Sequence, residues 1–200
     1  PNTAEHKSMK TFAVTPDDFN CAKLTAALPE LRSRGVTHVY IRSASRQEIE
    51  GMVAAACSSE IIPIIPYIQY RHDLRTTCGV HFKRNELSLL SHHAPSDAPA
   101  VTASCHGSVD ARLALQAGAH FVLVSPVFPP LSKPDDTRQP FPRDELRRLV
   151  AEYGEKIVLL GGMTQQRIRE LKKDIEGDFS VAGISFLFNP EIAERNDCPT

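Results

Sequence analysis

The feature that most constrains the fold is an alternation of short apolar runs with longer stretches of helical period. The apolar runs, which we predict to be strands, cover residues 11–15, 36–42, 61–68, 79–82, 100–104, 120–126, 156–162 and 180–188. The stretches between them, which we predict to be helices, cover residues 21–34, 46–57, 70–77, 85–93, 108–118, 143–154 and 164–175. The runs show no clean period of two, which favours parallel strands that are buried on both faces.

Eight strand and helix units are enough to close a (β/α)8 barrel, whereas an open doubly wound sheet more often has about five or six strands. The sequence contains neither GxGxxG nor the GxxxxGK loop, so nucleotide-binding open sheets lose their main support. We therefore predict a single short (β/α)8 TIM barrel over residues 10–190, an α/β fold, with a flexible N-terminal extension at 1–9 and a C-terminal tail at 191–200. The length of 200 residues is short for a barrel, and Pro63 and Pro66 are unusual in an internal strand.

Charge and hydropathy exclude several classes of partner. The chain has 23 basic and 24 acidic side chains and a formal net charge of -1, so bulk electrostatics favour neither nucleic acid nor an anionic membrane. No run reaches the ~18 apolar residues that a membrane helix needs. The five cysteines form no CxxC pair. We expect a cytoplasmic protein with reduced thiols and a small-molecule partner; a homodimer stays open.

In a (β/α)8 barrel the functional side chains lie at the C-terminal ends of the strands. The predicted strand ends nominate Arg42, Gln69, Tyr70, His81, Lys83, Ser104, His106, Ser125, Lys133, Gly161 and Gly162. His81 lies within an apolar strand, where a histidine is more often a packed residue with hydrogen-bond partners.

The most specific local signal is LLGGM followed by TQQRI. Gly161 and Gly162 allow the backbone to approach a ligand, Thr164 is a suitable helix cap, and the helix that follows presents free amides and partial positive charge. A phosphate near the seventh and eighth strands is the expected occupant. The alternative is a tight turn between strand and helix that binds nothing.

Two other side chains are candidates for chemistry. His106 follows TASC at the end of the fifth strand, and an imidazole with an unperturbed pKa of ~6.5 can accept and donate a proton near neutrality. The alternative is an ordinary loop histidine. Lys133 lies in the longest loop, where it either neutralises phosphate oxygens or serves solubility. Asp135 and Asp136, in the same loop, are better explained as solvated than as metal ligands.

Three segments resemble the thiamine phosphate synthase and thiazole tautomerase superfamily of small (β/α)8 barrels. They are SCHGSVDARLALQAGAHFVLVSPVFPPLSKP, IVLLGGMTQQRI and VAGISFLF. In that superfamily a serine and a histidine on strand 5, a strand-6 loop rich in proline, hydroxyl groups and lysine, a double glycine and a strand-8 serine recur in this order. The resemblance covers most of the second half and extends weakly into the first half through VYIR, IQYR and GVHF.

The resemblance implies an enzyme of thiamine biosynthesis that binds a thiazole phosphate. Its implied substrate- and phosphate-binding residues are Arg42, Ser104, Ser125, Ser132, Gly161, Gly162, Ile184 and Ser185, the last two in the eighth strand. Ser104, Ser132 and Lys133 would face a pyrophosphate end. His106, as the residue that moves a proton, and Lys133 are the implied catalytic residues.

The first half of the chain departs from the pattern of the synthase branch. That branch usually has Asn-Asp after strand 3 and an aspartate after GVH, where this chain has Gln69-Tyr70 and Glu86. One expected carboxylate for magnesium is therefore missing, so we assign no metal ligand and expect magnesium only if the protein is a synthase. Further departures are Tyr40 for a glutamine, Ala44 for a lysine, Pro130 for a hydroxyl residue and Phe186 for a small residue.

Three functions are therefore open. The first is a tautomerase-like isomerase that uses His106 as general acid and base and needs no metal. The second is a thiamine phosphate synthase, a transferase that joins a pyrimidine diphosphate to the thiazole phosphate, with an altered magnesium site. The third is a barrel that binds phosphate without catalysis, and the retained His106 counts against it.

Overall fold

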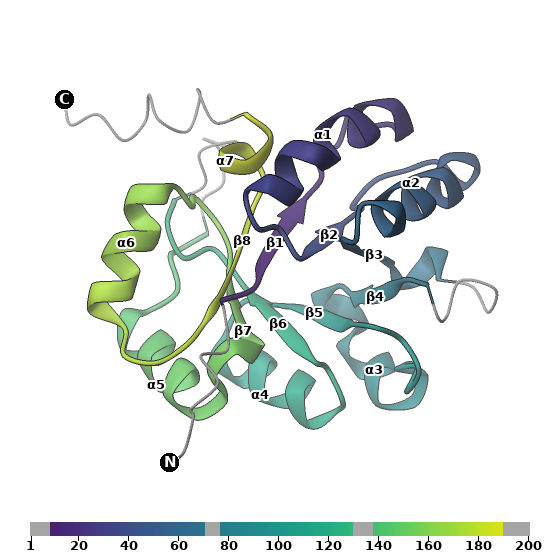
Figure 1. The fold of residues 1–200 in the computed structure, drawn as a ribbon. Coiled ribbons are helices and arrows are strands. Elements are labelled where there is room, and N and C mark those ends of the chain that lie inside the picture. The colour runs from purple at the N-terminus through teal and green to yellow at the C-terminus, as the bar shows by residue number, and fades with distance from the viewer. Residues whose placement is uncertain (1–8, 71–76, 130–137, 190–200) are drawn as a thin grey trace, which may run out of the picture.

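The computed structural model describes residues 9–70, 77–129 and 138–189. Eight parallel strands pair in chain order, and β8 pairs with β1 to close the barrel. The helices cover the outside, as Figure 1 shows. The prediction of a (β/α)8 barrel is confirmed. Residues 1–8 of the extension predicted at 1–9, the tail predicted at 191–200 and most of the helix predicted at 70–77 lie outside the described residues.

The strands are short and the helices differ in length. The strands are β1 (Thr11–Val14), β2 (His38–Tyr40), β3 (Ile62–Pro66), β4 (Gly79–Phe82), β5 (Val101–Cys105), β6 (Phe121–Val124), β7 (Ile157–Leu159) and β8 (Ser180–Gly183). The helices are α1 (Cys21–Ser33), α2 (Arg46–Ser58), α3 (Leu87–His93), α4 (Ser108–Gln116), α5 (Arg143–Tyr153), α6 (Gln165–Asp174) and α7 (Ser185–Phe188). No helix in the described part of the chain is both long and apolar enough to cross a membrane.

Side chains fix where several helices begin. The Asn20 amide oxygen accepts a hydrogen bond from Lys23 N at 2.9 Å before α1. Ser45 caps α2 through the backbone N of Glu48, and Thr164 caps α6 through Arg167 N. These bonds satisfy amides that the first helical turn leaves without partners. The predicted cap at Thr164 is confirmed.

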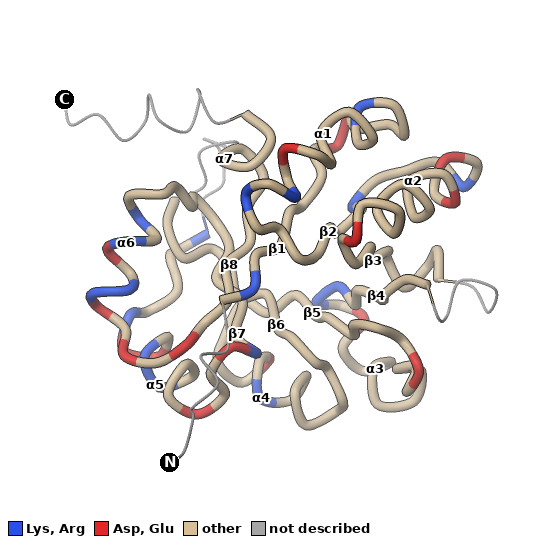
Figure 2. The backbone as a smooth tube through the Cα atoms, viewed as in Figure 1, with Lys and Arg blue, Asp and Glu red and all other residues tan. Residues whose placement is uncertain are grey.

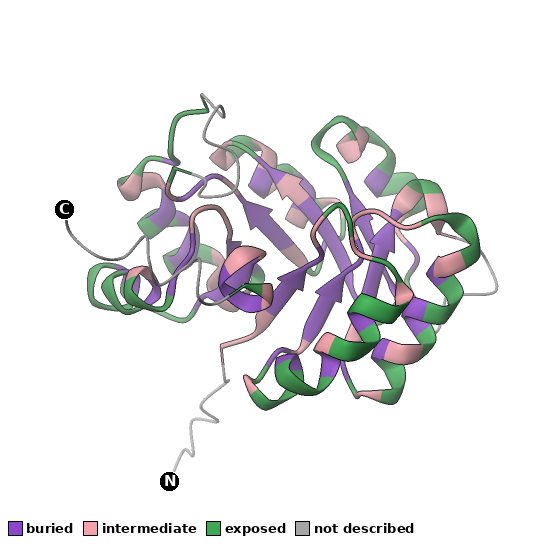
Figure 3. Cartoon of the chain, turned by 90° about the horizontal axis from the view of Figure 1, so that it is seen from above, coloured by how far each residue is buried: buried purple, intermediate pink, exposed green. Residues whose placement is uncertain are grey.

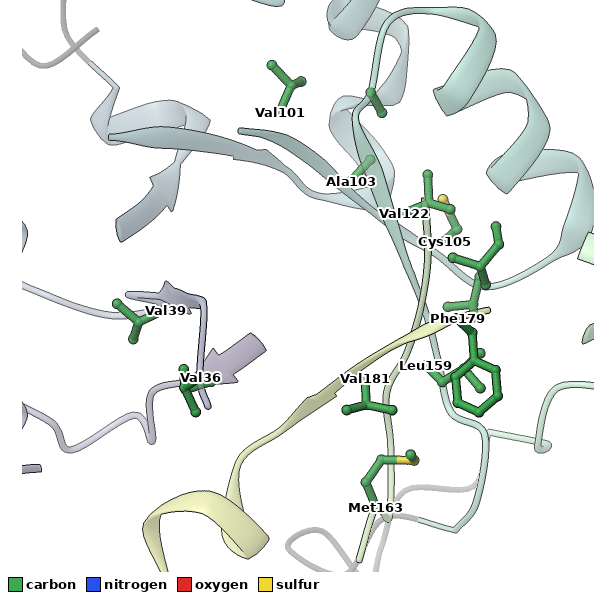
Figure 4. Close-up of a cluster of buried hydrophobic side chains, with 14 of the residues drawn as sticks. Val36, Val39, Val101, Ala103, Cys105, Val122, Leu159, Met163, Phe179 and Val181 are labelled. Atoms are coloured by element: carbon green, nitrogen blue, oxygen red, sulfur yellow. The ribbon is translucent and has the colours of Figure 1, made fainter. Parts of the chain in front are cut away.

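Burial on both faces explains why the apolar runs lack a period of two. Phe12 and Val14 point into the barrel with residues such as Leu123 and Val158, whereas Ala13 between them packs on the outer, helix-covered side. Across residues 9–70, 77–129 and 138–189, no strand contains Lys, Arg, Asp or Glu, and these residues lie on helices and loops (Figure 2). Figure 3 shows buried strands and helices whose outer faces are exposed, and Figure 4 shows part of the packing outside the barrel.

The two prolines fit β3 because of its register. Ile62 and Ile64 bond to the β2 side, through Ile62 N to Thr37 O and Ile41 N to Ile64 O. The backbone nitrogen of Pro63 therefore points towards β4, but β3 pairs with β4 only from Ile64 onwards. The backbone nitrogen of Pro66 points towards β2, but β3 pairs with β2 only as far as Ile64. Neither missing N–H leaves a ladder hydrogen bond unmade. A 3-10 turn at Tyr67–Gln69 follows, so the strand is shorter than the predicted 61–68.

The prediction of one strand over residues 180–188 was wrong. The strand β8 ends at Gly183, and Ser185 begins α7, so neither Ile184 nor Ser185 lies in a strand. The Phe186 side chain is buried and its ring lies directly over Gly183, at the place a Cβ atom would occupy. A short apolar run cannot distinguish a buried strand from a buried helical turn, because both are apolar throughout.

His38 is a buried polar residue inside the barrel. Its ring stacks on Phe12 with centroids 4.2 Å apart and meets the edge of Phe121. Its Nδ1 lies 2.8 Å from Thr37 Oγ1. Burial, with a smaller effect of the Lys10 charge, lowers the pKa of His38 to about 4. Between about pH 4 and pH 6.5, the His38 imidazole is therefore neutral in the folded protein and protonated in the unfolded chain.

We expect the free energy of unfolding to fall as the pH is lowered from about 6.5 towards 4, because only the unfolded imidazole takes up a proton there. In the His38→Phe variant, which keeps an aromatic ring on Phe12, this contribution is absent. Between pH 7 and pH 5 the wild type should lose about 2 kcal/mol more than the variant, as measured by urea unfolding at both pH values. An equal loss in both proteins would contradict the assignment.

Candidate functional site

A cavity of about 460 Å³ opens at the C-terminal ends of the strands. This volume suits a small molecule. Its apolar floor is formed by Val14, Tyr40, Leu123, Leu160 and Ile184. Its polar wall is formed by Arg42, Lys83, Arg84, Asn85, Ser104, His106, Ser125 and Arg138. We call this space the mouth cavity.

The charge on the wall of the mouth cavity has one sign. Arg42, Lys83, Arg84 and Arg138 supply four cations, and no lining residue among those described is an aspartate or glutamate. Lys83 and Arg84 directly follow β4. A cavity with cations on its wall and an apolar floor favours an organic anion.

Three carboxylates that contact residues of the cavity wall are Asp17, Asp110 and Glu86. Asp17 Oδ1 pairs with Arg42 Nη2 at 2.8 Å. Asp110 Oδ2 accepts from Arg84 Nε at 2.8 Å and from the backbone N of His106 at 3.4 Å. Glu86 Oε2 accepts from the backbone N of Lys83 at 2.8 Å. These carboxylates therefore position the cations and the start of the β4 loop.

His106 is held by a backbone carbonyl. Its Nδ1 lies 2.8 Å from the oxygen of Ser125, which can only accept, so Nδ1 carries the hydrogen. In the neutral ring the lone pair is then on Nε2, and Arg138 Nη1 lies 3.4 Å from that atom. The geometry thus fixes the tautomer of His106 and leaves on the cavity wall an acceptor nitrogen, Nε2, that the Arg138 guanidinium approaches.

A second histidine lies beneath the cavity. His81 is fully buried, with Nδ1 2.9 Å from Thr102 Oγ1 and Nε2 2.8 Å from Ser104 Oγ, and its ring lies against Tyr40. Burial, with a smaller effect of Lys83, lowers the pKa of His81 to about 3. So weak a base does not activate the Ser104 hydroxyl as a nucleophile. It orients that hydroxyl, and the prediction that His81 is a packed, hydrogen-bonded residue is confirmed.

The double glycine packs against the loop after β6. Gly161 and Gly162 both have positive φ, 103° and 59°. A Cβ on Gly161 would come within 2.8 Å of Pro126 Cα, and one on Gly162 would overlap the carbonyl oxygen of Pro129. Phe128 N also donates to Gly161 O at 3.2 Å. The turn therefore needs glycine for backbone packing, whether or not a ligand binds there.

We expect Gly162→Ala to lower the free energy of unfolding by about 2 kcal/mol or more, because it combines a left-handed backbone with steric overlap. The matched control is Gly35→Ala, where φ is 74° but a Cβ would meet nothing within 4 Å. We expect the control to lose about 1 kcal/mol from backbone strain alone. Urea unfolding measures both, and equal losses would contradict the role given to the overlap.

The structure brings together part of the predicted site. Arg42, Ser104, His106, Ser125 and Ile184 line the mouth cavity. Gly161, Gly162 and Ser185 do not line it, although their neighbours Leu160 and Ile184 do. The predicted residues Ser132 and Lys133 lie outside the described residues.

The sequence reasoning missed two cations at the site. Arg84 follows Lys83 in the FKRN segment. Its position just after a predicted strand is the sequence feature that could have identified it as a site residue. Arg138 belongs to the connection between β6 and α5, where nothing in the sequence distinguishes it from neighbouring charged residues. Tyr40, noted only as a departure from a family pattern, forms part of the floor.

The side chains that the structure describes do not form a binding site for a divalent cation. No group of three or more His, Cys, Asp or Glu side chains among residues 9–70, 77–129 and 138–189 could hold a metal ion. Glu86, the carboxylate available in place of the usual aspartate, has one oxygen committed to the Lys83 amide. Magnesium prefers several oxygen ligands at once, which these side chains do not assemble.

The fold and the site together define a (β/α)8 barrel with a cation-lined mouth. A family model described as thiamine monophosphate synthase matches residues 11–186. The thiamine-phosphate synthase of Methanobrevibacter smithii is 31% identical over 198 residues. The match covers 94% of this chain and 93% of that protein. The chain belongs to the thiamine monophosphate synthase family.

Solved structures show the same fold. A thiamine phosphate pyrophosphorylase from Pyrococcus furiosus superposes with a TM-score of 0.63 at 18% identity, covering 95% of this chain and 98% of its own. An HpcH/HpaI aldolase from Desulfitobacterium hafniense gives a TM-score of 0.57 at 11% identity, covering 96% and 94%. At these identities the likeness concerns the fold alone.

Proposed function

We propose that the protein is an enzyme that binds a thiazole phosphate in the mouth cavity and uses His106 to move a proton on it, as a tautomerase does. The observation that carries this proposal is the hydrogen bond from His106 Nδ1 to Ser125 O, which leaves Nε2 as the proton acceptor. Tautomerisation moves one proton and changes no other bond partner, so one group that accepts a proton and returns it is sufficient.

The cavity supports the same proposal through its two surfaces. The apolar floor, which includes Leu123, Leu160 and Ile184, suits the flat face of a small heterocycle. The phosphate would lie towards Gly161, Gly162 and Ser185, near the start of the capped helix α6, where amides and the helix dipole favour an anion. His81 is a poor competing base, because burial lowers the pKa of its imidazole and so makes it a weak proton acceptor.

A second candidate function is thiamine phosphate synthesis, which joins a pyrimidine diphosphate to the thiazole phosphate with loss of pyrophosphate. The number of cations on the wall favours it, since four exceed what one phosphate requires. The name of the Methanobrevibacter smithii relative agrees with it.

The experiment gives the purified protein two mixtures. One contains only the non-aromatic tautomer of the thiazole phosphate, and the other contains the aromatic form with pyrimidine diphosphate and magnesium. Aromatisation in the first mixture supports the tautomerase proposal, and thiamine phosphate in the second makes synthesis the function. Binding without turnover in either mixture overturns both and leaves a barrel that only binds.

His106→Ala should lower the turnover number about 100-fold or more, because it removes the proton acceptor. Stability should change little, since the His106 side chain is exposed. The matched control is His92→Ala, an exposed histidine near the end of α3, which should retain full activity. Steady-state kinetics of the same conversion measures both variants, and full activity in His106→Ala would contradict the assigned role.

A further inference from the structure

The cations of the mouth cavity surround it from several strands. Arg42 follows β2, Lys83 and Arg84 follow β4, and Arg138 lies between β6 and α5. A single phosphate group reaches only donors within about 3 Å of its own oxygens. Donors placed after three different strands therefore match an anion with more than one phosphate.

Several of these cations have capacity left for a ligand. Among the described residues no carboxylate pairs with Lys83 Nζ. Within the same described part of the chain, the buried Arg42 Nε has no hydrogen-bond partner, although Arg42 Nη2 pairs with Asp17. A buried donor without a partner costs free energy that a bound acceptor would restore. Arg84 bonds to Asp110 through Nε, which leaves its terminal nitrogens.

The carboxylates that would hold a metal near this anion are instead used to fix the cations. Asp17 holds Arg42, Asp110 holds Arg84, and Glu86 holds the Lys83 backbone. A diphosphate needs its charge neutralised, and either a divalent cation or several guanidinium and ammonium groups can do this. The described residues provide the second arrangement and not the first.

We propose that the mouth cavity binds a diphosphate group directly through Lys83, Arg84 and Arg138, with Arg42 at its edge, and that this binding requires no divalent cation. The inference rests on the second candidate function, because a diphosphate is a group that only the synthase reaction uses. It goes beyond that function in assigning to side chains the charge neutralisation that a metal ion would otherwise supply.

The test is isothermal titration calorimetry of the full chain with inorganic pyrophosphate, once in EDTA and once in magnesium. We expect binding in EDTA, with a dissociation constant that magnesium changes by less than about threefold. Arg84→Gln and Arg138→Gln should each weaken binding about tenfold or more, because each removes charge-assisted hydrogen bonds. The matched control Arg112→Gln removes an exposed arginine on α4 that pairs with Glu152, and it should bind as the wild type does.

Binding that appears only with magnesium would overturn the inference, as would unchanged affinity in both arginine variants. Circular dichroism tests whether each variant is folded. If one arginine variant does not fold, the Lys83→Gln variant replaces it in the titration. The result is separable from the proposed function. If pyrophosphate binds without metal but neither mixture turns over, the inference stands and the proposed function is contradicted. If the protein turns over but binds pyrophosphate only with magnesium, the inference alone is contradicted.

Discussion

The structure depends on the closure of the sheet, in which Thr11, Phe12 and Ala13 of β1 pair with Val181, Ala182 and Gly183 of β8. Closure leaves no strand edge, so every strand can be apolar on both faces and bury both. It also gathers the carboxyl ends of all eight strands into one ring. Side chains that lie far apart in the sequence, such as Arg42 and Arg138, consequently line one cavity.

Histidine lies in opposite environments at different depths in this barrel. His38 and His81 lie inside it, where desolvation keeps the rings neutral and their nitrogens bond to hydroxyl groups. His106 lies beyond the end of β5, exposed and oriented by a carbonyl. The position along the strand, rather than the identity of the residue, separates an imidazole that burial keeps neutral from one that is exposed at the cavity wall.

The sequence predicts the architecture because the alternation of apolar and helical stretches directly reflects two-sided burial. It also predicts that Arg42, Ser104, His106 and Ser125 lie at one end, since strand ends share a face of the barrel. It does not predict the end of β8, because ISFLF is equally apolar as a strand or as a helical turn. Nor does it indicate Arg138, since a charged residue in a long connection carries no periodic signal.

The pairing of β1 with β8 also governs when this chain can fold. Those strands are separated by nearly the whole described sequence, so the first strand made on a ribosome waits for the last one. After β8, the Arg34 guanidinium binds the carbonyl oxygens of Phe186 and Leu187, which ties the end of the barrel to the end of α1. Until that segment emerges, β1 and β7 are both open edges that can pair with other chains. Protection of the nascent chain against aggregation is therefore needed from the emergence of β1 until that of β8.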